Sequence, residues 1–355
     1  MTHATAESYQ RFARLEAQPT SPIYADWAAS VAEDHEVLEL IASLPRAKRQ
    51  PNLIFAAARS AGAPLGSSAD FLRWLADNWG RVEAIARSRM TQTNEAGRCA
   101  VLLPLLSRIE GPVALIEAGA SAGLCLYPDR YSYRYRSAAG EDVLHPEDGP
   151  GAVELPCFLE GMPLPSRLPE IVSRAGIDLN PLDLQDRADA RWLETLVWPE
   201  HDARRERLRA AAGVVAADPP RLVRGDIVEE LPRLVAEAPS DAAVVVFHSA
   251  VLVYLEPERR RQFIDLVRSL DVIWISNEGE QVLPEISTLL PCSAGGRTVL
   301  SQNGIPYAFT GPHGQSCEGF QASAEWDQSY MIAGNRFAGV SSPQYTVYTR
   351  VHRRT

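Results

Sequence analysis

Polar or acidic side chains follow each of five apolar stretches in the last two thirds of the chain. One such position alone would be a weak signal. Because open parallel sheets bind ligands beyond the carboxyl ends of their strands, five of them in order predict one ligand site assembled from several loops. In chain order they are Glu117 with Gly119, Ser121 and Gly123, then Asp178, then Asp226 with Ile227, then His248 with Ser249, and then Asn277 with Glu278 and Glu280.

The first of these stretches, Glu117-Ala-Gly-Ala-Ser-Ala-Gly123, is typical of a tight turn that binds a ligand. A dinucleotide turn, GxGxxG, would need glycine where the chain has Ser121 and Leu124. The S-adenosylmethionine (SAM) turn, E/D-x-G-x-G-x-G, matches except that Ser121 replaces the middle glycine. Glycine lets a ligand approach the backbone closely, and the N–H groups of a following helix would favour the carboxylate of an amino-acid cofactor. The Ser121 hydroxyl either contacts this ligand or obstructs it.

Two aspartates follow the next two apolar stretches and fit a nucleoside. Asp178 can accept hydrogen bonds from both ribose hydroxyls, although it is further from the glycine turn than the usual twenty or so residues, which an insertion would explain. Asp226, with the neighbouring Ile227, is placed to meet the adenine. The alternative for both aspartates is the N-cap of a helix.

The candidates for catalysis are His248, Ser249 and Glu278. His248 follows the strongest apolar stretch, and its unperturbed pKa near neutrality suits proton transfer. The alternative is a partly buried histidine whose polar atoms are satisfied within the protein. Ser249 could instead cap the following segment, and Glu278 could bind substrate or lie in a solvated loop.

A dense polar segment in the N-terminal part could cover the same pocket, or could simply start a helix. A tyrosine-rich segment after the glycine turn could supply an aromatic wall, or could be one face of a strand. The residues concerned are Gln92, Thr93, Asn94, Glu95 and Arg98 in the first segment and Tyr131 in the second.

The elements that must position these residues follow from the spacing of apolar side chains. Residues 1–110 have helical periodicity, notably over 21–44, over 67–90 with Ser68 as N-cap, and over 94–109. From residue 111 to 355, short Val- and Ile-rich runs alternate with helical stretches, which predicts an α/β fold with a doubly wound, Rossmann-like, mostly parallel sheet. The predicted strands are 113–119, 175–179, 221–227, 242–249 and 272–279.

Two parts interrupt this alternation. Residues 131–165 have period-two polarity and turn residues, which predicts a β-hairpin insertion after the first unit. Residues 297–314, with a hairpin turn at Asn303-Gly304, and residues 344–353 also have β character and would close the sheet with an antiparallel pair. The helical N-terminal part would then act as a lid, or form the interface of a homo-oligomer.

Composition excludes several classes of protein. The net charge of −10 disfavours nucleic-acid binding, and the one basic cluster, residues 201–211, is interpreted as a solvated helix face. The single lysine, Lys48, follows no glycine-rich loop, which excludes a Walker-type phosphate site. The five cysteines form no CxxC pair, and no zinc-type cluster is present, so we expect no metal. The longest apolar run, 242–255, is too short to span a membrane, and we expect a cytoplasmic protein.

Five stretches in order closely resemble the DUF2332 proteins, a bacterial family of unknown function. They are residues 92–104, 115–133, 176–184, 190–200 and 244–255. The second half also resembles class I SAM-dependent methyltransferases. This second resemblance implies that the segment from Glu117 to Gly123 is motif I, that Asp178 and Asp226 contact the ribose and the adenine, and that His248 and Ser249 belong to motif IV.

These observations leave two main hypotheses of different class. The first is a SAM-dependent methyltransferase acting on an unidentified small molecule, with neither nucleic acid nor membrane as partner. The second is a non-catalytic protein that binds SAM or another nucleoside on the same fold. An NAD-linked enzyme is disfavoured by the failed GxGxxG pattern.

Overall fold

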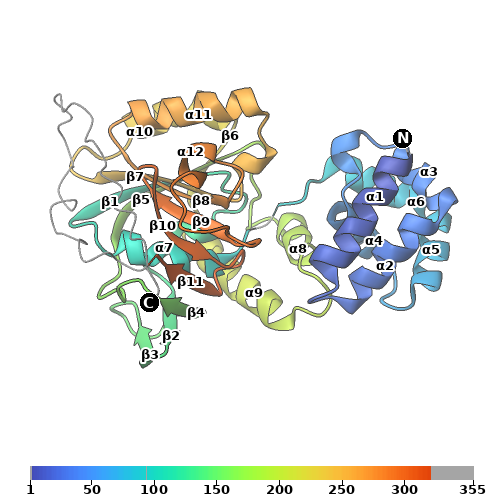
Figure 1. The fold of residues 1–355 in the computed structure, drawn as a ribbon, viewed down its shortest axis with the longest axis horizontal. Coiled ribbons are helices and arrows are strands. Elements are labelled where there is room, and N and C mark those ends of the chain that lie inside the picture. Colours follow the sequence, from blue (N-terminus) through green and yellow to red (C-terminus); the bar gives the residue numbers. More distant parts are fainter. Residues whose placement is uncertain (1, 93, 321–355) are drawn as a thin grey trace, which may run out of the picture.

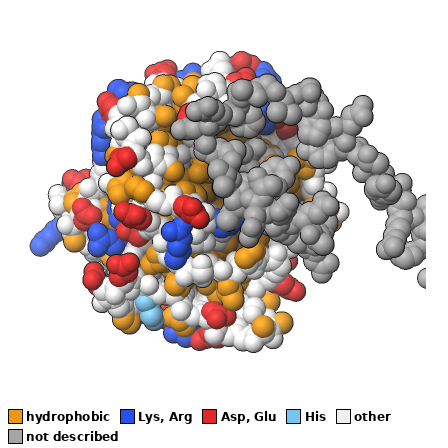
Figure 2. Space-filling model, turned by 90° about the vertical axis from the view of Figure 1, so that its left-hand side faces the viewer, with side chains coloured by type: hydrophobic (Ala, Val, Ile, Leu, Met, Phe, Trp, Pro, Cys, Tyr) orange, Lys and Arg blue, Asp and Glu red, His pale blue; other side chains and the backbone are white. Residues whose placement is uncertain are grey.

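The computed structural model describes residues 2–92 and 94–320, and comprises a helical part and a large sheet with helices on both faces (Figure 1). The predicted strand at 344–353 and Thr93 lie outside the described residues. No helix of the described residues is both long and apolar enough to cross a membrane. Figure 2 views the side of the molecule away from the helical part, where the visible acidic and basic side chains are interspersed.

The N-terminal part is helical, as predicted, but two of its predicted helices are each broken in two. Asp34 ends one helix and caps the next by accepting a hydrogen bond from Val37 N (2.9 Å), and a second break lies at Asn78. The helix predicted to start with Ser68 as N-cap is instead capped by Ser67. The elements are α1 (Thr2–Phe12), η1 (Ala13–Ala17), α2 (Pro22–Glu33), α3 (His35–Ala42), η2 (Arg46–Lys48), α4 (Pro51–Ala61), α5 (Ser68–Asp77) and α6 (Trp79–Ser88).

All five predicted strands are confirmed, and they pair in parallel in the order β6-β5-β1-β7-β8. Their alternate side chains enter two apolar cores, one on each face of the sheet, which explains why the strand sequences are apolar throughout. The strands are β1 (Pro112–Ala118), β5 (Glu170–Asp178), β6 (Arg221–Arg224), β7 (Ala243–Ser249) and β8 (Ile273–Gly279).

Six further strands extend the same sheet beyond β8. The predicted turn at Asn303-Gly304 is confirmed, with φ of 52° and 82°, the values that a two-residue hairpin turn requires. The predicted hairpin insertion is confirmed as β2 with β3, but it also contains β4, which joins the sheet by pairing with β11. The strands are β2 (Ser132–Ser137), β3 (Gly140–Leu144), β4 (Glu154–Glu160), β9 (Thr298–Gln302), β10 (Ile305–Thr310) and β11 (Ser316–Gly319).

Helices cover both faces of the sheet. On one face lie α10 (Ile227–Ala236), α11 (Pro257–Ser269) and the short α12 (Pro284–Ser287) (Figure 1). Helix α7 (Cys99–Leu106), which the predicted limit at residue 110 assigns to the helical part, contacts β4 and β9. Helix α8 (Arg187–Thr195) contacts α4 and precedes α9 (Asp202–Ala217), so the chain returns to the helical part between β5 and β6.

The segment between the helical part and the sheet is held by a close backbone contact. The turn η3 (Ala96–Arg98) packs against the loop after β10, and a Cβ added to Gly97 would lie 2.5 Å from the His313 carbonyl oxygen. A Cβ added to Gly314 would lie 1.9 Å from the Gly97 carbonyl oxygen. Only glycine allows this approach, which brings Arg98 to the carboxyl edge of the sheet.

Candidate functional site

The glycine turn follows β1, at the place where the order of the parallel strands reverses. The chain runs from β1 outward to β5 and β6 on one side, and then to β7 and β8 on the other. Such a reversal separates the loops that follow the two central strands and opens a crevice at their carboxyl ends. The turn itself is left-handed at three positions, with φ of 77° at Gly119, 52° at Ser121 and 77° at Gly123.

Asp178 and the glycine turn are brought together, as the sequence predicts for a common site. The Ser121 amide donates to Asp178 Oδ2 (2.8 Å), and the Asn180 amide donates to Asp178 Oδ1 (2.8 Å). Gln92 reaches the same loop and donates from Nε2 to the Asn180 carbonyl (2.6 Å). The carboxylate of Asp178 is half-buried and keeps lone pairs for further donors.

The space over Gly119 is filled by protein. A Cβ added to Gly119 would lie 2.4 Å from Val251 Cγ2, so this glycine is needed for close packing of the segment 250–255. After Gly123 the chain forms a single 3-10 turn, η4 (Leu124–Leu126), and the Leu124 amide is already bound by Asn94 Oδ1 (2.8 Å). The expected α-helix N-terminus, which would have received a cofactor carboxylate, is therefore absent from this turn.

Three buried polar atoms around the turn have no hydrogen-bond partner among the described residues: Gln92 Oε1, Glu117 Oε2 and Ser121 Oγ. Burial raises the pKa of Glu117 well above its usual range, Cys125 and Asp178 add to the increase, and Arg98 opposes it. Burial thus favours the neutral carboxylic acid form of Glu117, which can donate as well as accept. Buried polar groups are normally satisfied, so these atoms mark a place where a polar ligand or water completes the structure.

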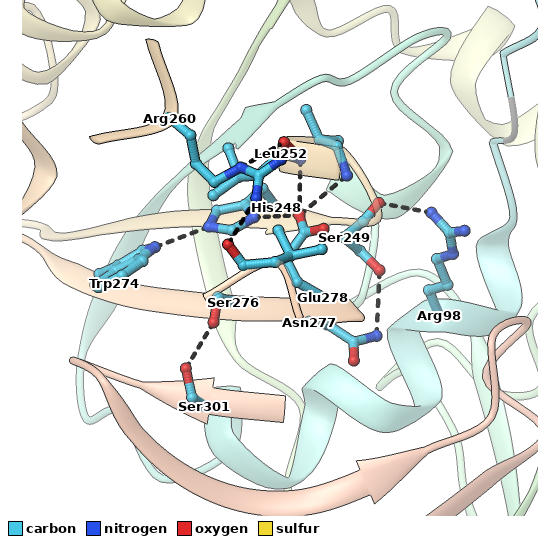
Figure 3. A network of polar contacts seen from close by, with 12 residues as sticks. Arg98, His248, Ser249, Leu252, Arg260, Trp274, Ser276, Asn277, Glu278 and Ser301 are labelled. Atoms are coloured by element: carbon cyan, nitrogen blue, oxygen red, sulfur yellow. Dashed lines mark hydrogen bonds and ion pairs between the residues drawn. The ribbon is translucent and has the colours of Figure 1, made fainter. Parts of the chain in front are cut away.

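His248 is fully buried, and both of its ring nitrogens are engaged (Figure 3). Trp274 Nε1 donates to His248 Nε2 (3.0 Å), which leaves the proton on Nδ1, 2.7 Å from Glu278 Oε1. No ring nitrogen is free to accept a proton from a substrate. This geometry favours the structural alternative for His248 over the general base.

The Glu278 side chain is buried and hydrogen-bonded within the protein, so it is not open to substrate. Its Oε1 accepts from His248 Nδ1 and also from the amides of Val251 (3.0 Å) and Leu252 (3.1 Å). It thereby anchors the start of the segment 250–255, which includes the 3-10 turn η5 (Leu252–Tyr254). Arg260 holds the same segment by donating to the Leu252 carbonyl (3.0 Å) (Figure 3).

Ser249 lies on the opposite face of the sheet from His248 and belongs to a second network. Asn277 Nδ2 donates to Ser249 Oγ (3.1 Å), and Arg98 Nη1 donates to the Ser249 carbonyl (2.8 Å) (Figure 3). Arg98 also donates from Nε to the Pro312 carbonyl (3.1 Å). This network joins the N-terminal polar segment to the end of β7.

The remaining predicted residues have structural partners. Asp226 is the N-cap of α10, accepting from Val228 N (2.8 Å), and it pairs with Arg259, while Ile227 is buried in the core under α10. Tyr131 is buried and donates to the Leu124 carbonyl (2.7 Å). The position of Asp226 agrees with the N-cap alternative, whereas Tyr131 lies directly before β2 and not on a strand face.

Three residues of this region were missed at the sequence level. Val251 covers Gly119, and its apolar side chain gives no signal of such a role. Arg204 and Arg207 of α9 pair with Glu95, and their side chains are 16% and 20% exposed, so the interpretation of residues 201–211 as a solvated face is wrong for these two. Among the described residues, no group of three or more His, Cys, Asp or Glu side chains is placed to hold a metal ion.

Relative to wild type, Glu117→Gln should raise the free energy of unfolding more at about pH 8 than at about pH 5. The carboxyl loses its proton near pH 4.3 in the unfolded chain but at higher pH in the fold, so wild-type stability falls by about 1.4 kcal/mol per pH unit between the two pKa values. The amide does not titrate. Thermal unfolding of both proteins at the two pH values checks this, and an equal difference at both would contradict it.

Glu278→Ala should lower the free energy of unfolding by about 3–5 kcal/mol, because three buried N–H groups lose their acceptor. Glu278→Gln keeps an acceptor oxygen for these donors but puts an amide group where the buried Glu278 Oε2 has no partner among the described residues, so with a neutral His248 it should cost about 1–3 kcal/mol, less than Glu278→Ala. Urea denaturation measures both. If the Gln variant is as unstable as the Ala variant, His248 and Glu278 form a charged pair instead.

Comparison with known proteins places the chain in a family without assigning an activity. No curated protein matches the chain. Residues 6–318 match a family described as an uncharacterized protein conserved in bacteria, DUF2332. Because this match extends over most of the chain, the protein belongs to the DUF2332 family.

Proposed function

We propose that the protein binds SAM at the carboxyl edge of β1 and β5 and transfers its methyl group to a small molecule. The observation that carries the proposal is the junction of Ser121 and Asp178, where a left-handed turn at the reversal of strand order is bound directly to the acid at the end of the next strand. Doubly wound sheets bind nucleotides at such a reversal.

The side chains around Asp178 are of the types that bind a nucleoside. Asp178 would accept hydrogen bonds from ribose hydroxyls, and the unpartnered Gln92 Oε1, Glu117 Oε2 and Ser121 Oγ offer further acceptors and donors. The methionine half of SAM would clash with the protein, because Val251 fills the space over Gly119. The segment 250–255 would therefore have to shift away from the turn for this half to bind.

Bound SAM supplies an electrophilic methyl group, and the protein's own residues would contribute mainly position. Methyl transfer is an in-line displacement, for which alignment of two reactants accounts for much of the rate. Since neither His248 nitrogen is free, this proposal does not assign His248 as general base. Glu278 would act as a positioning residue by holding Val251 and Leu252.

A second candidate function is non-catalytic binding of SAM or another nucleoside. The engaged His248 favours it, because the best candidate for proton transfer has no free nitrogen. Incubation with labelled SAM and a panel of small-molecule acceptors separates the two functions. Binding without labelled product would support the non-catalytic function.

Val251→Ala should tighten SAM binding by about tenfold, because two methyl groups no longer have to be displaced from the space over Gly119. Isothermal titration calorimetry with SAM and S-adenosylhomocysteine measures the change. Val253→Ala is the matched control, since Val253 lies in the same segment and is 53% exposed. Absence of binding of both compounds to wild type and to Val251→Ala at about millimolar concentration would overturn the proposal.

Ser121→Gly should raise the free energy of unfolding by about 1 kcal/mol, because Ser121 has φ of 52° and a buried hydroxyl without a partner. If the hydroxyl contacts SAM, the same variant should bind SAM more weakly. Thermal unfolding and titration on one preparation measure both effects. A stabilised variant with unchanged or tighter SAM binding would show that the side chain is only an obstruction.

A further inference from the structure

Two arginines of α9 pair with Glu95 at the junction of η3 and α9, and Arg98 follows Glu95 in η3. Arg204 Nε donates to Glu95 Oε2 (2.6 Å), and Arg207 Nε donates to Glu95 Oε1 (3.1 Å). Glu95 is 4% exposed and also accepts from the Gly97 amide (3.2 Å). Arg98, in the next turn of the chain, is close enough to Arg204 to act on it electrostatically.

This cluster has an excess of positive charge. One carboxylate pairs with two guanidinium groups, and the carbonyl acceptors of the neighbouring Arg98 do not neutralise its charge. Burial lowers the pKa of Arg204, Glu95 opposes this, and Arg98 and Arg207 add to the decrease. His313 lies beside the cluster, and burial together with Arg204 lowers its pKa to about 3, so it is neutral near pH 7.

The guanidinium groups also have unused donors. Arg204 and Arg207 each bind Glu95 through Nε alone, and their Nη atoms donate to no described residue. Arg98 Nη2 is likewise without an acceptor among the described residues. Arginine usually uses its planar fork of donors to bind carboxylate or phosphate groups. The partial exposure of Arg204 and Arg207 leaves their Nη atoms within reach of a small solute.

We propose that Arg98, Arg204 and Arg207 form a binding site for the oxyanion group, a carboxylate or a phosphate, of a small molecule. The unused Nη donors and the uncompensated charge carry this inference. Arg98 connects the site to the end of β7 through Ser249, so it borders the same edge of the sheet as the glycine turn (Figure 3). We assign the bound oxyanion group to the methyl acceptor rather than to SAM. This assignment rests on the proposed function.

The alternative is that the arginines serve only to neutralise Glu95 and join α9 to η3. One arginine would balance the charge of Glu95, and the single Nε contacts of Arg204 and Arg207 leave most of their donors unused. In a chain with a net charge of −10, such a local excess of positive charge would also attract anionic solutes. Anion binding therefore distinguishes the two interpretations.

The test is isothermal titration with inorganic phosphate and with citrate at constant ionic strength. Wild type should bind at least one of them with Kd of about 1 mM or tighter. Arg207→Gln and Arg204→Gln should weaken binding about tenfold or more, because each removes charge-assisted hydrogen bonds. Arg209→Gln is the matched control: it removes the same charge from α9, but Arg209 is 58% exposed and pairs with Glu194. It should leave the affinity unchanged.

Three results would overturn the inference: no binding of either anion to wild type, equal affinity in folded Arg207→Gln, or equal weakening in Arg209→Gln. Circular dichroism shows whether each variant is folded. Arg207 is the more exposed of the two arginines, so its variant keeps the test valid if Arg204→Gln does not fold. Separate titration with SAM distinguishes the two proposals, since anion binding without SAM binding would support this site and contradict the proposed function.

Discussion

The hydrogen bonds to Glu278 Oε1 determine the form of the carboxyl edge of the sheet. This single buried oxygen accepts hydrogen bonds from the His248 ring and from the amides of Val251 and Leu252. It therefore connects β7, β8 and the segment that follows β7. In a low-dielectric interior such bonds are strong, and each of these donors would be costly to leave unpaired. The position of Val251 over the glycine turn depends on them.

The same edge carries two sets of polar groups with different chemistry. Gln92, Glu117 and Ser121 present buried atoms near Asp178 that have no partner in the described part of the chain, which suits hydroxyl groups of a ligand. Arg204 and Arg207 present charged donors, which suits an anion. The segment 94–98 connects them, because Asn94 binds the glycine turn and Glu95 binds the two arginines. Under the proposed function, the first region would hold the nucleoside and the second the methyl acceptor.

Much of the fold could be predicted because its signals are local. Apolar runs bounded by turns identified the five parallel strands, and Asn303-Gly304 identified a hairpin by the φ values it permits. Asp34 and Asn78 divided helices that periodicity alone joined. The Asp34 side chain caps the new helix, whereas the Asn78 side chain donates to the Trp74 carbonyl at the end of the old one. The pairing of β4 with β11 had no local signal, because these strands are distant in the chain.

For the site, the sequence by itself determined which polar residues reach the carboxyl edge, since each follows a strand whose end is encoded by neighbouring residues. It did not determine their partners. His248 is satisfied by Trp274 and Glu278, and Glu95 is paired with an arginine 109 residues away. Only the tertiary structure decided these pairings, because a buried polar group bonds to whatever donor or acceptor packing brings within about 3 Å, irrespective of its distance along the chain.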